Sequence, residues 1–447
     1  MSLRPVFQRI GQKHIDSLEI EAVLDLAESS KGGGVWLASA GGIHLLIPAH
    51  FVSPPGLPES GPWANIEDQD GSRYVTIGEV YHILREGQQY RVETFPTGNW
   101  RSSTSMEKDN YGRLWIADFD GRVMHTDLNT RKSGIMDFRN QGGTIFYMKR
   151  DSKGFIWACQ APEDKPLVGI TRINPADLSS RHFGKEEGLE TRVIDLKERE
   201  DASIIFGCVG AESYLYRYDP VSEQFTNISL RLPFTPASVF EVHNIETQGR
   251  DTIWLATTDG LLCYNGKSIT RTQTGWPLTE EIRSVTKGPD GALWLGSKKD
   301  GIGWLKNEEF VQFGISSGLP TDELDYATIF TDQKGYVWIG TAAGLVVSSE
   351  PYPTPPPTMR PHWQIAGYPE NTADGKLPEF PYQSSIVSSF FAYTFTQEPT
   401  LYQTRIVEKS PEWSQPVESP SWDTGPLAAG IYTLEVCVRH GTGYAWS

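Results

Sequence analysis

The stretch that decides the fold is residues 332–345, DQKGYVWIGTAAGL. An Asp leads through a Gly into an apolar run centred on Trp338, and a short polar turn then leads to Gly344 and Leu345. Apolar runs on both sides of a turn signal indicate two antiparallel strands. Because a short hairpin unit cannot bury its apolar face alone, the number of copies along the chain determines the architecture.

The stretch recurs through most of the chain. Clear copies contain a Trp in the same place, and two degenerate copies put Tyr74 and Ile205 there. Successive copies are separated by 38 to 49 residues, so the period is about 43. We expect the marked side chains to be structural core residues packed between neighbouring units: Trp36, Tyr74, Trp115, Trp157, Ile205, Trp254, Trp294 and Trp338.

Each repeat holds four short strands, which is the content of a β-propeller blade. In the last repeats the predicted strands are 308–315, 326–332, 334–341 and 343–349. The chain is therefore predicted to be all-β, with a single eight-bladed propeller, or seven blades if a degenerate copy is not a blade. Residues 4–11, RPVFQRIG, resemble a fourth strand, so we expect this N-terminal strand to close the last blade.

Turns of the form Asp-x-x-Gly precede several of the repeat strands. They begin at Asp109, Asp151 and Asp332, and each ends at a glycine three residues later. An Asp in this position bonds to its own backbone, and the glycine takes a positive φ. We therefore interpret these aspartates as turn residues and expect no bound metal and no cofactor.

A different kind of sequence follows the repeats. Residues 351–361, PYPTPPPTMRP, have the composition of a stiff, extended linker. Several alternating segments with turn signals between them follow, as in SIVSSFFAYTF and GIYTLEVCVRH. The predicted domains are a propeller over 1–350, a Pro-rich linker over 351–361 and an Ig-like β-sandwich over 362–447.

Composition excludes several functions. The formal net charge of −16 repels phosphate backbones, so no nucleic-acid partner is expected. No apolar run reaches the ~18 residues of a membrane span, and the first residues lack the apolar centre of a signal peptide. The four cysteines form no CxxC pair and are interpreted as buried thiols, with a periplasmic disulfide left open.

The sequence contains no G-x-S-x-G elbow, no H-E-x-x-H, no phosphate loop and no G-x-G-x-x-G. Carboxylates cluster at Asp322, Glu323 and Asp325, and at Glu19 and Glu21. We interpret them as solvated turn acids, although a pair facing across a cleft, as in a glycosidase, stays open.

A ligand site is expected where loops enter the innermost strand of each blade, around the central channel. Aromatic faces there can stack on sugar rings, and Arg can bind hydroxyls or carboxylates, so three Arg favour an anionic ligand. The alternative is that these are ordinary loop residues. The candidate ligand-binding residues are Trp63, Arg101, Tyr147, Arg192, His243, Arg283 and Tyr326.

The repeats resemble two-component regulator propeller repeats, whose pattern is D-x-x-G-x-hydrophobic-W-hydrophobic-G-T-x-x-G-L. Residues 332–345 match it almost throughout, and SSGLPTDEL resembles the G-L-P turn that often follows. The C-terminal part resembles the Y_Y_Y domain that often follows such propellers. The residues that carry this second resemblance are Tyr402, Trp413, Leu427, Gly430, Tyr432, Trp446 and Ser447.

The resemblance implies the periplasmic sensor region of a bacterial transmembrane histidine kinase, hybrid two-component sensor or diguanylate cyclase. Such a chain is not itself an enzyme, and it binds a small molecule, an oligosaccharide in the best-known relatives. It meets the membrane only through a segment outside this chain, and a kinase output implies a homodimer. The chain departs from many relatives in having one propeller, and it lacks the strand that usually follows the final Trp-Ser.

Two other function classes stay open. One is a propeller that binds proteins and has no small ligand, which a flat face without a pocket would favour. The other is a propeller lyase resembling streptogramin B lyase, for which His243 near Glu241 would be the starting point.

Overall fold

The computed structural model describes residues 23–28, 35–39, 42–46, 50–87, 89–97, 100, 103–139, 143–160, 169–249, 251–272, 274, 280–288, 290–307, 309–324, 329–351, 362–366, 379–391 and 400–440. The chain divides into two compact units. The larger comprises residues 50–310 and 317–353, and the smaller comprises residues 1–49, 311–316 and 354–447. Each unit is described by itself.

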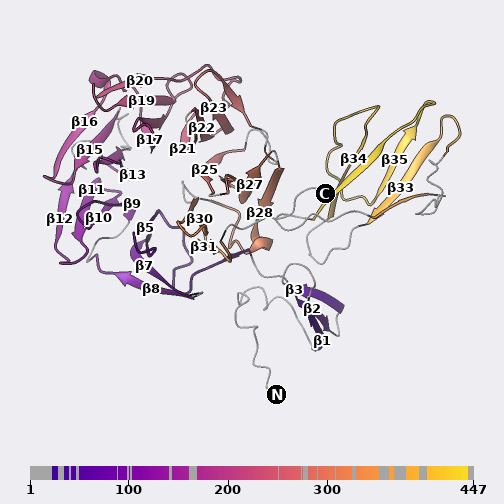
Figure 1. Ribbon diagram of the computed structural model, residues 1–447, viewed down its shortest axis with the longest axis horizontal. Coiled ribbons are helices and arrows are strands. Elements are labelled where there is room, and N and C mark those ends of the chain that lie inside the picture. The colour runs from indigo at the N-terminus through magenta and orange to yellow at the C-terminus, as the bar shows by residue number, and fades with distance from the viewer. Residues whose placement is uncertain are drawn as a thin grey trace. The chain divides into compact units, whose positions relative to one another are not determined.

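Seven four-stranded antiparallel sheets follow one another along the described part of the chain between residues 51 and 348. In Figure 1 they form a ring, with the first strand of each sheet toward the centre. With the strands of each sheet given from the centre outward, the first three sheets are β5 (Ala64–Glu67), β6 (Arg73–Ile77), β7 (Glu79–Glu86) and β8 (Gln89–Phe95); β9 (Ser103–Lys108), β10 (Arg113–Asp118), β11 (Arg122–Asp127) and β12 (Ser133–Asp137); and β13 (Ile145–Arg150), β14 (Ile156–Gln160), β15 (Ile170–Asn174) and β16 (Ser179–Phe183). The next two sheets are β17 (Val193–Glu198), β18 (Ile204–Cys208), β19 (Leu215–Asp219) and β20 (Gln224–Asn227); and β21 (Val242–Gln248), β22 (Thr252–Thr257), β23 (Gly260–Tyr264) and β24 (Ile269–Arg271). The last two sheets are β25 (Ile282–Lys287), β26 (Leu293–Ser297), β27 (Ile302–Lys306) and β28 (Glu309–Phe313); and β29 (Ile329–Thr331), β30 (Val337–Thr341), β31 (Gly344–Ser348) and β4 (Phe51–Val52).

The last sheet is closed by a strand from the beginning of the ring. Val52 pairs with Val347 and Phe51 with Ser348, so β4 takes the outer position. The prediction that residues 4–11 fill this position is therefore wrong, and those residues lie outside the described part of the chain. Side chains of the first and last sheets share one apolar cluster that includes Val75, Ile77, Trp338, Leu345 and Val347, which joins the ends of the ring.

The expected count of eight blades differs from the seven sheets described. The repeat around Trp36 forms the three-stranded sheet of β1 (Val23–Glu28), β2 (Val35–Ser39) and β3 (Gly42–Leu46). The next strand along the chain, β4, belongs to the last sheet of the ring, and one strand cannot complete both. The two degenerate copies, around Tyr74 and Ile205, do form full four-stranded sheets.

The Asp-x-x-Gly turns have a second role that the sequence reading missed. Besides bonding to the turn backbone, each Asp accepts a hydrogen bond from the indole N–H of the repeat Trp six residues later. The Nε1–Oδ2 distances are 2.8 Å for Trp115 and Asp109, 2.8 Å for Trp157 and Asp151, and 3.0 Å for Trp338 and Asp332. A buried Trp therefore fixes the turn that precedes its own strand, which explains the constant spacing.

A glycine is required two positions after two of the marked residues, Ile205 and Trp294. A Cβ on Gly207 would lie 2.7 Å from a methyl group of Val242, and one on Gly296 would lie 2.8 Å from Leu324. β21 thus approaches β18 closely, and Leu324, which precedes β29 in the chain, approaches β26 closely, as in a close-packed core. The turn glycines Gly112, Gly154 and Gly335 have φ values of 80°, 91° and 87°.

Most of the marked residues are buried. Trp115, Trp157 and Ile205 are fully buried, and Trp294 and Trp338 are 2% exposed. Tyr74 is 6% exposed, whereas Trp254 is only partly buried against its cluster. The side chain of Trp36 lies outside the described part of the structure.

Strands of the C-terminal region form two further sheets. One contains β32 (His362–Ile365), β33 (Ser385–Phe391) and β35 (Ser421–Pro426), and the other contains β34 (Thr400–Ile406) and β36 (Leu434–His440). Side chains of both sheets meet in shared apolar clusters, as Phe390, Tyr402 and Val438 do. The Ig-like assignment and the domain boundaries stay predictions, and residues 352–361 and 441–447 lie outside the described part.

Short 3-10 helices occur at Lys185–Glu187 and Ile315–Ser317. Within the described residues, no helix has the length and apolar character needed to cross a membrane.

Candidate functional site

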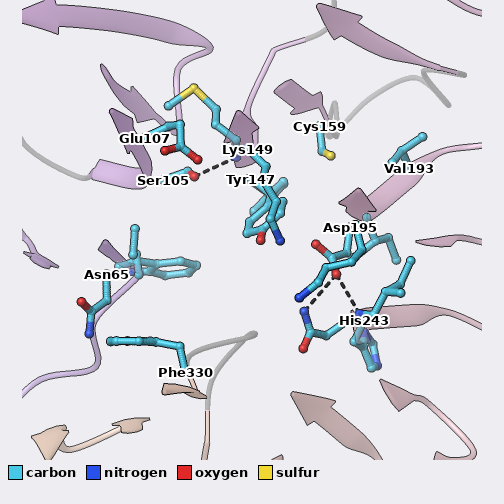
Figure 2. Close-up of a pocket in the computed structure, with 18 of the residues that line it drawn as sticks. Asn65, Ser105, Glu107, Tyr147, Lys149, Cys159, Val193, Asp195, His243 and Phe330 are labelled. Carbon is cyan, nitrogen blue, oxygen red and sulfur yellow. Dashed lines mark hydrogen bonds between the residues drawn. The ribbon is translucent and has the colours of Figure 1, made fainter. Parts of the chain in front are cut away.

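The innermost strands of the ring enclose a cavity of about 390 Å³, and all seven contribute residues to its wall. The prediction that such a site would lie around the central channel refers to this region. Figure 2 shows Asn65 and Phe330 on one side of the cavity, Asp195 and His243 on the other, and Tyr147 between them.

A β-bulge interrupts the start of five innermost strands. In each, one residue has no partner in the second strand, and the register shifts by one. A bulge re-aims side chains and increases the local twist, which suits a strand that must present polar groups at a channel mouth. The bulged residues are Thr104, Phe146, Ile194, His243 and Arg283.

In four of these five strands, the residue after the bulge ties neighbouring sheets together. Its side-chain oxygen accepts a hydrogen bond from a backbone N–H of the next innermost strand. In these bonds the donor is always a backbone N–H group, so they join neighbouring sheets without occupying the side-chain donors of the wall. The acceptor and donor residues are Ser105 and Met148 (2.8 Å), Asp195 and Ile245 (2.8 Å), Asn244 and Val285 (2.8 Å), and Ser284 and Ile329 (3.3 Å).

Asp195 is the acid among these four acceptors. Its side chain lines the cavity and is 1% exposed. Its Oδ2 accepts bonds from the Asn244 side chain at 2.9 Å and from the Ile245 N–H at 2.8 Å. No group of the described residues forms a hydrogen bond of good geometry to Oδ1, although the Tyr147 phenol and the Leu196 N–H both interact with this carboxylate. Burial raises the pKa of Asp195 above its usual range, and the nearby Lys149 cation opposes that rise.

Tyr147 takes the equivalent position in the sheet before Asp195. Burial, and after it the Asp195 carboxylate, raises the pKa of the Tyr147 phenol well above its usual value. The phenol therefore stays protonated and can donate a hydrogen bond at any physiological pH. Lys149, two residues along the same strand, also lines the cavity and forms no ion pair with any described residue.

Two of the predicted arginines are already paired with acids. Arg192 contacts Glu241 at 2.9 Å, and Arg283 contacts Glu281 at 3.0 Å. His243, 3.4 Å from Glu281, and then Lys298 and Arg283 hold the pKa of Glu281 well below its usual range. Because these internal acids neutralise both arginines, the arginines give no specific support for an anionic ligand.

Further acidic and basic side chains lie on the same innermost strands, two positions after the residue that follows the bulge. Lys197 contacts Glu246 at 2.9 Å. Glu107 accepts the backbone N–H groups of Lys108 and Arg150 at 2.9 and 3.0 Å, and burial raises its pKa. Lys149 is therefore the cation left unpaired in the described wall of the cavity.

Exposed aromatic side chains lie beside the cavity. The ring centroids of Trp63 and Phe119 are 5.0 Å apart, and those of Phe119 and Phe146 are 6.1 Å apart, both in edge-to-face contact. The three side chains are 36–42% exposed and come from three consecutive sheets. Trp63 and Phe146 also line the cavity, so the aromatic surface continues into it.

Four of the seven predicted ligand-binding residues line the cavity: Trp63, Tyr147, Arg192 and His243. Arg283 does not, and Arg101 and Tyr326 lie outside the described residues. The sequence reading missed Asp195, Lys149 and Gln160. The repeat alignment could have indicated Asp195, because it follows the bulge of its strand as Tyr147 does.

Metal and acid-pair chemistry gain no support from the described residues. No group of three or more His, Cys, Asp or Glu among them could hold a metal ion. Asp322 and Glu323 are absent from the described cavity wall, and Asp325, Glu19 and Glu21 lie outside the described residues. The four cysteines are free thiols, three of them buried.

Solved structures share this fold. No family model and no curated protein sequence matches the chain. The extracellular domain of a hybrid two component system from B. thetaiotaomicron has a TM-score of 0.66 at 17% identity, over 96% of this chain and 61% of that one. Virginiamycin B lyase from Staphylococcus aureus has a TM-score of 0.53 at 15% identity, over 66% of this chain and 97% of that one. The WD40 β-propeller domain of Doa1 has a TM-score of 0.51 at 12% identity, over 67% of this chain and 97% of that one.

Proposed function

We propose that the chain is the ligand-sensing, extracytoplasmic part of a bacterial transmembrane signalling protein, and that its ligand binds in the central cavity of the ring. The cavity carries this proposal, because it combines 390 Å³ of space with aromatic surface and a few fixed polar groups. The likeness over 96% of the chain to an extracellular domain of a two component system supports the sensor role.

In this proposal the chain itself catalyses no reaction. A ligand that prefers one of two arrangements shifts their populations, and the C-terminal sheets pass the change to a membrane segment outside this chain. A histidine kinase, hybrid kinase or diguanylate cyclase would give the output, with a homodimer as the working form and the periplasm as the location. An oligosaccharide is the first ligand class to test.

A thermal-shift screen against neutral and acidic oligosaccharides tests the proposal. A ligand at 100 times its Kd should stabilise the folded chain by about 2.7 kcal/mol, which a melting curve resolves. The shift should be lost in Lys149→Met, whose side chain lines the cavity, and kept in the matched surface variant Lys132→Met. A hit that both variants bind equally would move the site away from the cavity.

A propeller lyase is the second candidate, favoured by the presence of His243 and Glu241 in the cavity wall. Their separation of 4.0 Å would suit a base with an orienting acid. However, His243 is only 5% exposed and also lies 3.4 Å from Glu281. Incubation with quinupristin, the compound bound to the similar lyase, tests this candidate: turnover that His243→Ala abolishes would favour a lyase over a sensor.

The protein-binding alternative has less support, because a flat face without a pocket would favour it and the ring instead holds a cavity. It regains weight if no small molecule shifts the melting temperature.

A further inference from the structure

Three polar atoms in the wall of the cavity have no hydrogen-bond partner among the described residues: Asp195 Oδ1, Gln160 Nε2 and Asn65 Nδ2. Asp195 and Gln160 are each 1% exposed, so these are groups taken fully out of bulk solvent. An unsatisfied buried polar group costs about 1–3 kcal/mol. Native proteins keep few of them, and each calls for an explanation such as a ligand or an ordered water.

The protein fixes the other polar atom of each of these side chains. Asp195 Oδ2 accepts the Ile245 N–H at 2.8 Å, Gln160 Oε1 accepts the Thr171 hydroxyl at 2.7 Å, and Asn65 Oδ1 accepts Arg73 Nε–H at 2.9 Å. Because guanidinium only donates, the Asn65 amide cannot be turned around without losing its bond. Asp195 therefore presents a fixed free acceptor and Asn65 a fixed free donor, whereas the Gln160 amide can present either of its atoms because the Thr171 hydroxyl both donates and accepts.

The charges of the wall decide which chemistry fits these atoms. Arg192 and Lys197 are occupied by Glu241 and Glu246, whereas Lys149 forms no ion pair with a described residue but favours the charged form of Asp195 from nearby. The Asp195 carboxylate would repel an anionic group, and the Lys149 ammonium would repel a cationic group. An uncharged group that both donates and accepts satisfies all three free atoms without leaving either charge unbalanced.

We propose that Asp195, Gln160 and Asn65 form a binding subsite for a ligand with several uncharged groups that donate and accept hydrogen bonds, such as hydroxyls or primary amides. Figure 2 shows Asn65 and Asp195 on different sides of the cavity, so a ligand that reaches both must carry more than one such group. Tyr147, drawn between them, supplies an aromatic face and a phenol donor. The inference rests on the proposed function, because it takes the cavity as the ligand site.

Small probe molecules test directly whether the subsite prefers an uncharged, an anionic or a cationic group. Crystals soaked in glycerol, acetamide, acetate or methylammonium would show which probe occupies the subsite, and saturation-transfer NMR would give relative binding in solution. The expected result is glycerol or acetamide within hydrogen-bond distance of Asp195 Oδ1 or Gln160 Nε2, with at least tenfold weaker binding of acetate and methylammonium. Preference for either ion, or only water at all three atoms, would overturn the subsite.

Two variants reverse the polarity of single atoms without removing the hydrogen bond made by the other atom of the same side chain. Asp195→Asn can keep its carbonyl oxygen on Ile245 and turn an NH₂ into the cavity, and Gln160→Glu can keep its bond to Thr171 and turn in an oxygen. Asp195→Asn should weaken glycerol or acetamide binding about tenfold, because a charge-assisted hydrogen bond to the carboxylate is replaced by a neutral one, and Gln160→Glu, which adds a carboxylate to the wall, should raise the binding of methylammonium relative to glycerol. Ser284→Ala is the matched control, since it removes the bond to Ile329 but is absent from the cavity wall. Unchanged binding in Asp195→Asn would also overturn the subsite.

The experiment separates this inference from the proposed function. If the oligosaccharide screen finds a ligand in the cavity while the subsite holds only water, the sensor proposal survives and the subsite fails. If the probes occupy the subsite as expected and the screen finds nothing, the subsite survives and the sensor proposal weakens.

Discussion

Removal of the bond between Asp151 and the repeat residue Trp157 should destabilise the ring by an amount that can be separated from simple packing loss. Asp151 is 7% exposed and Trp157 is fully buried, and their Oδ2 and Nε1 atoms are 2.8 Å apart. A hydrogen bond to a charged group contributes about 1.5–3 kcal/mol. Each single variant also loses other contacts, so only the coupling between the two positions reports the bond itself.

A double-mutant cycle with Asp151→Ala and Trp157→Phe, measured by urea unfolding followed with far-UV circular dichroism, should give a coupling energy of about 2 kcal/mol. The chain supplies its own control. At the equivalent position Trp254 donates to the Gln248 amide at 2.9 Å, and this pair is exposed and uncharged. The cycle with Gln248→Ala and Trp254→Phe should give a coupling energy of about 0.5 kcal/mol or less.

Equal coupling energies in the two cycles would refute the reasoning. They would mean that the carboxylate of the Asp-x-x-Gly turn contributes no more than an exposed amide, and that the spacing of Asp and Trp has another cause.

Four further outcomes follow from the contacts. Phe51→Ala should lower the free energy of unfolding by about 3–5 kcal/mol, because Phe51 is 1% exposed and lies in the strand that closes the last sheet; an unchanged urea midpoint would contradict this closure. Arg73→Lys should cost about 2–3 kcal/mol, because the buried guanidinium lies 3.8 Å from the Phe330 ring centroid and 4.9 Å from that of Trp338 and also bonds to Asn65; equal melting temperatures would count against it. Because the folded-state pKa of Glu281 lies below its usual 4.5, the wild type should lose stability as the pH falls below that value, and Glu281→Gln should lose less; parallel melting profiles from pH 6 to pH 3 would refute this. Burial raises the folded-state pKa of Asp195 above its usual 3.8, so ionisation of this carboxyl should lower the stability of the fold increasingly as the pH rises from 3.8 to the folded-state pKa. Asp195→Asn should remove this pH dependence of stability, which melting profiles over the same pH range would reveal.

The repeat could be predicted from the sequence because a period of about 43 residues with one buried aromatic residue leaves few alternatives. The closing strand could not be predicted in the same way. Residues 4–11 and residues 51–52 both offer apolar side chains for an outer strand, and only pairing in space shows that Phe51 and Val52 take the position beside β31. The same fact explains why the repeat around Trp36 adds no eighth sheet to the ring.

The sequence could indicate the cavity but not the polar contacts in its wall, and ligand binding there stays a proposal. Aligned repeats indicated the channel, and four of the seven candidates line it. The sequence does not reveal the bulges, which shift the register so that Asp195 and Asn244, and not Arg192 and His243, take the positions equivalent to Tyr147. Nor could composition show that Glu241 neutralises Arg192, since these residues are 49 positions apart, whereas Glu281 lies only two residues before its partner Arg283.

The most direct test of the central claim is a crystal structure of the chain with the strongest hit from the oligosaccharide screen. The account predicts ligand density in the cavity between Tyr147, Asp195 and Phe330, with hydrogen bonds to Asp195 Oδ1 or Gln160 Nε2. Density on another surface, with the cavity unchanged from the unbound protein, would contradict it.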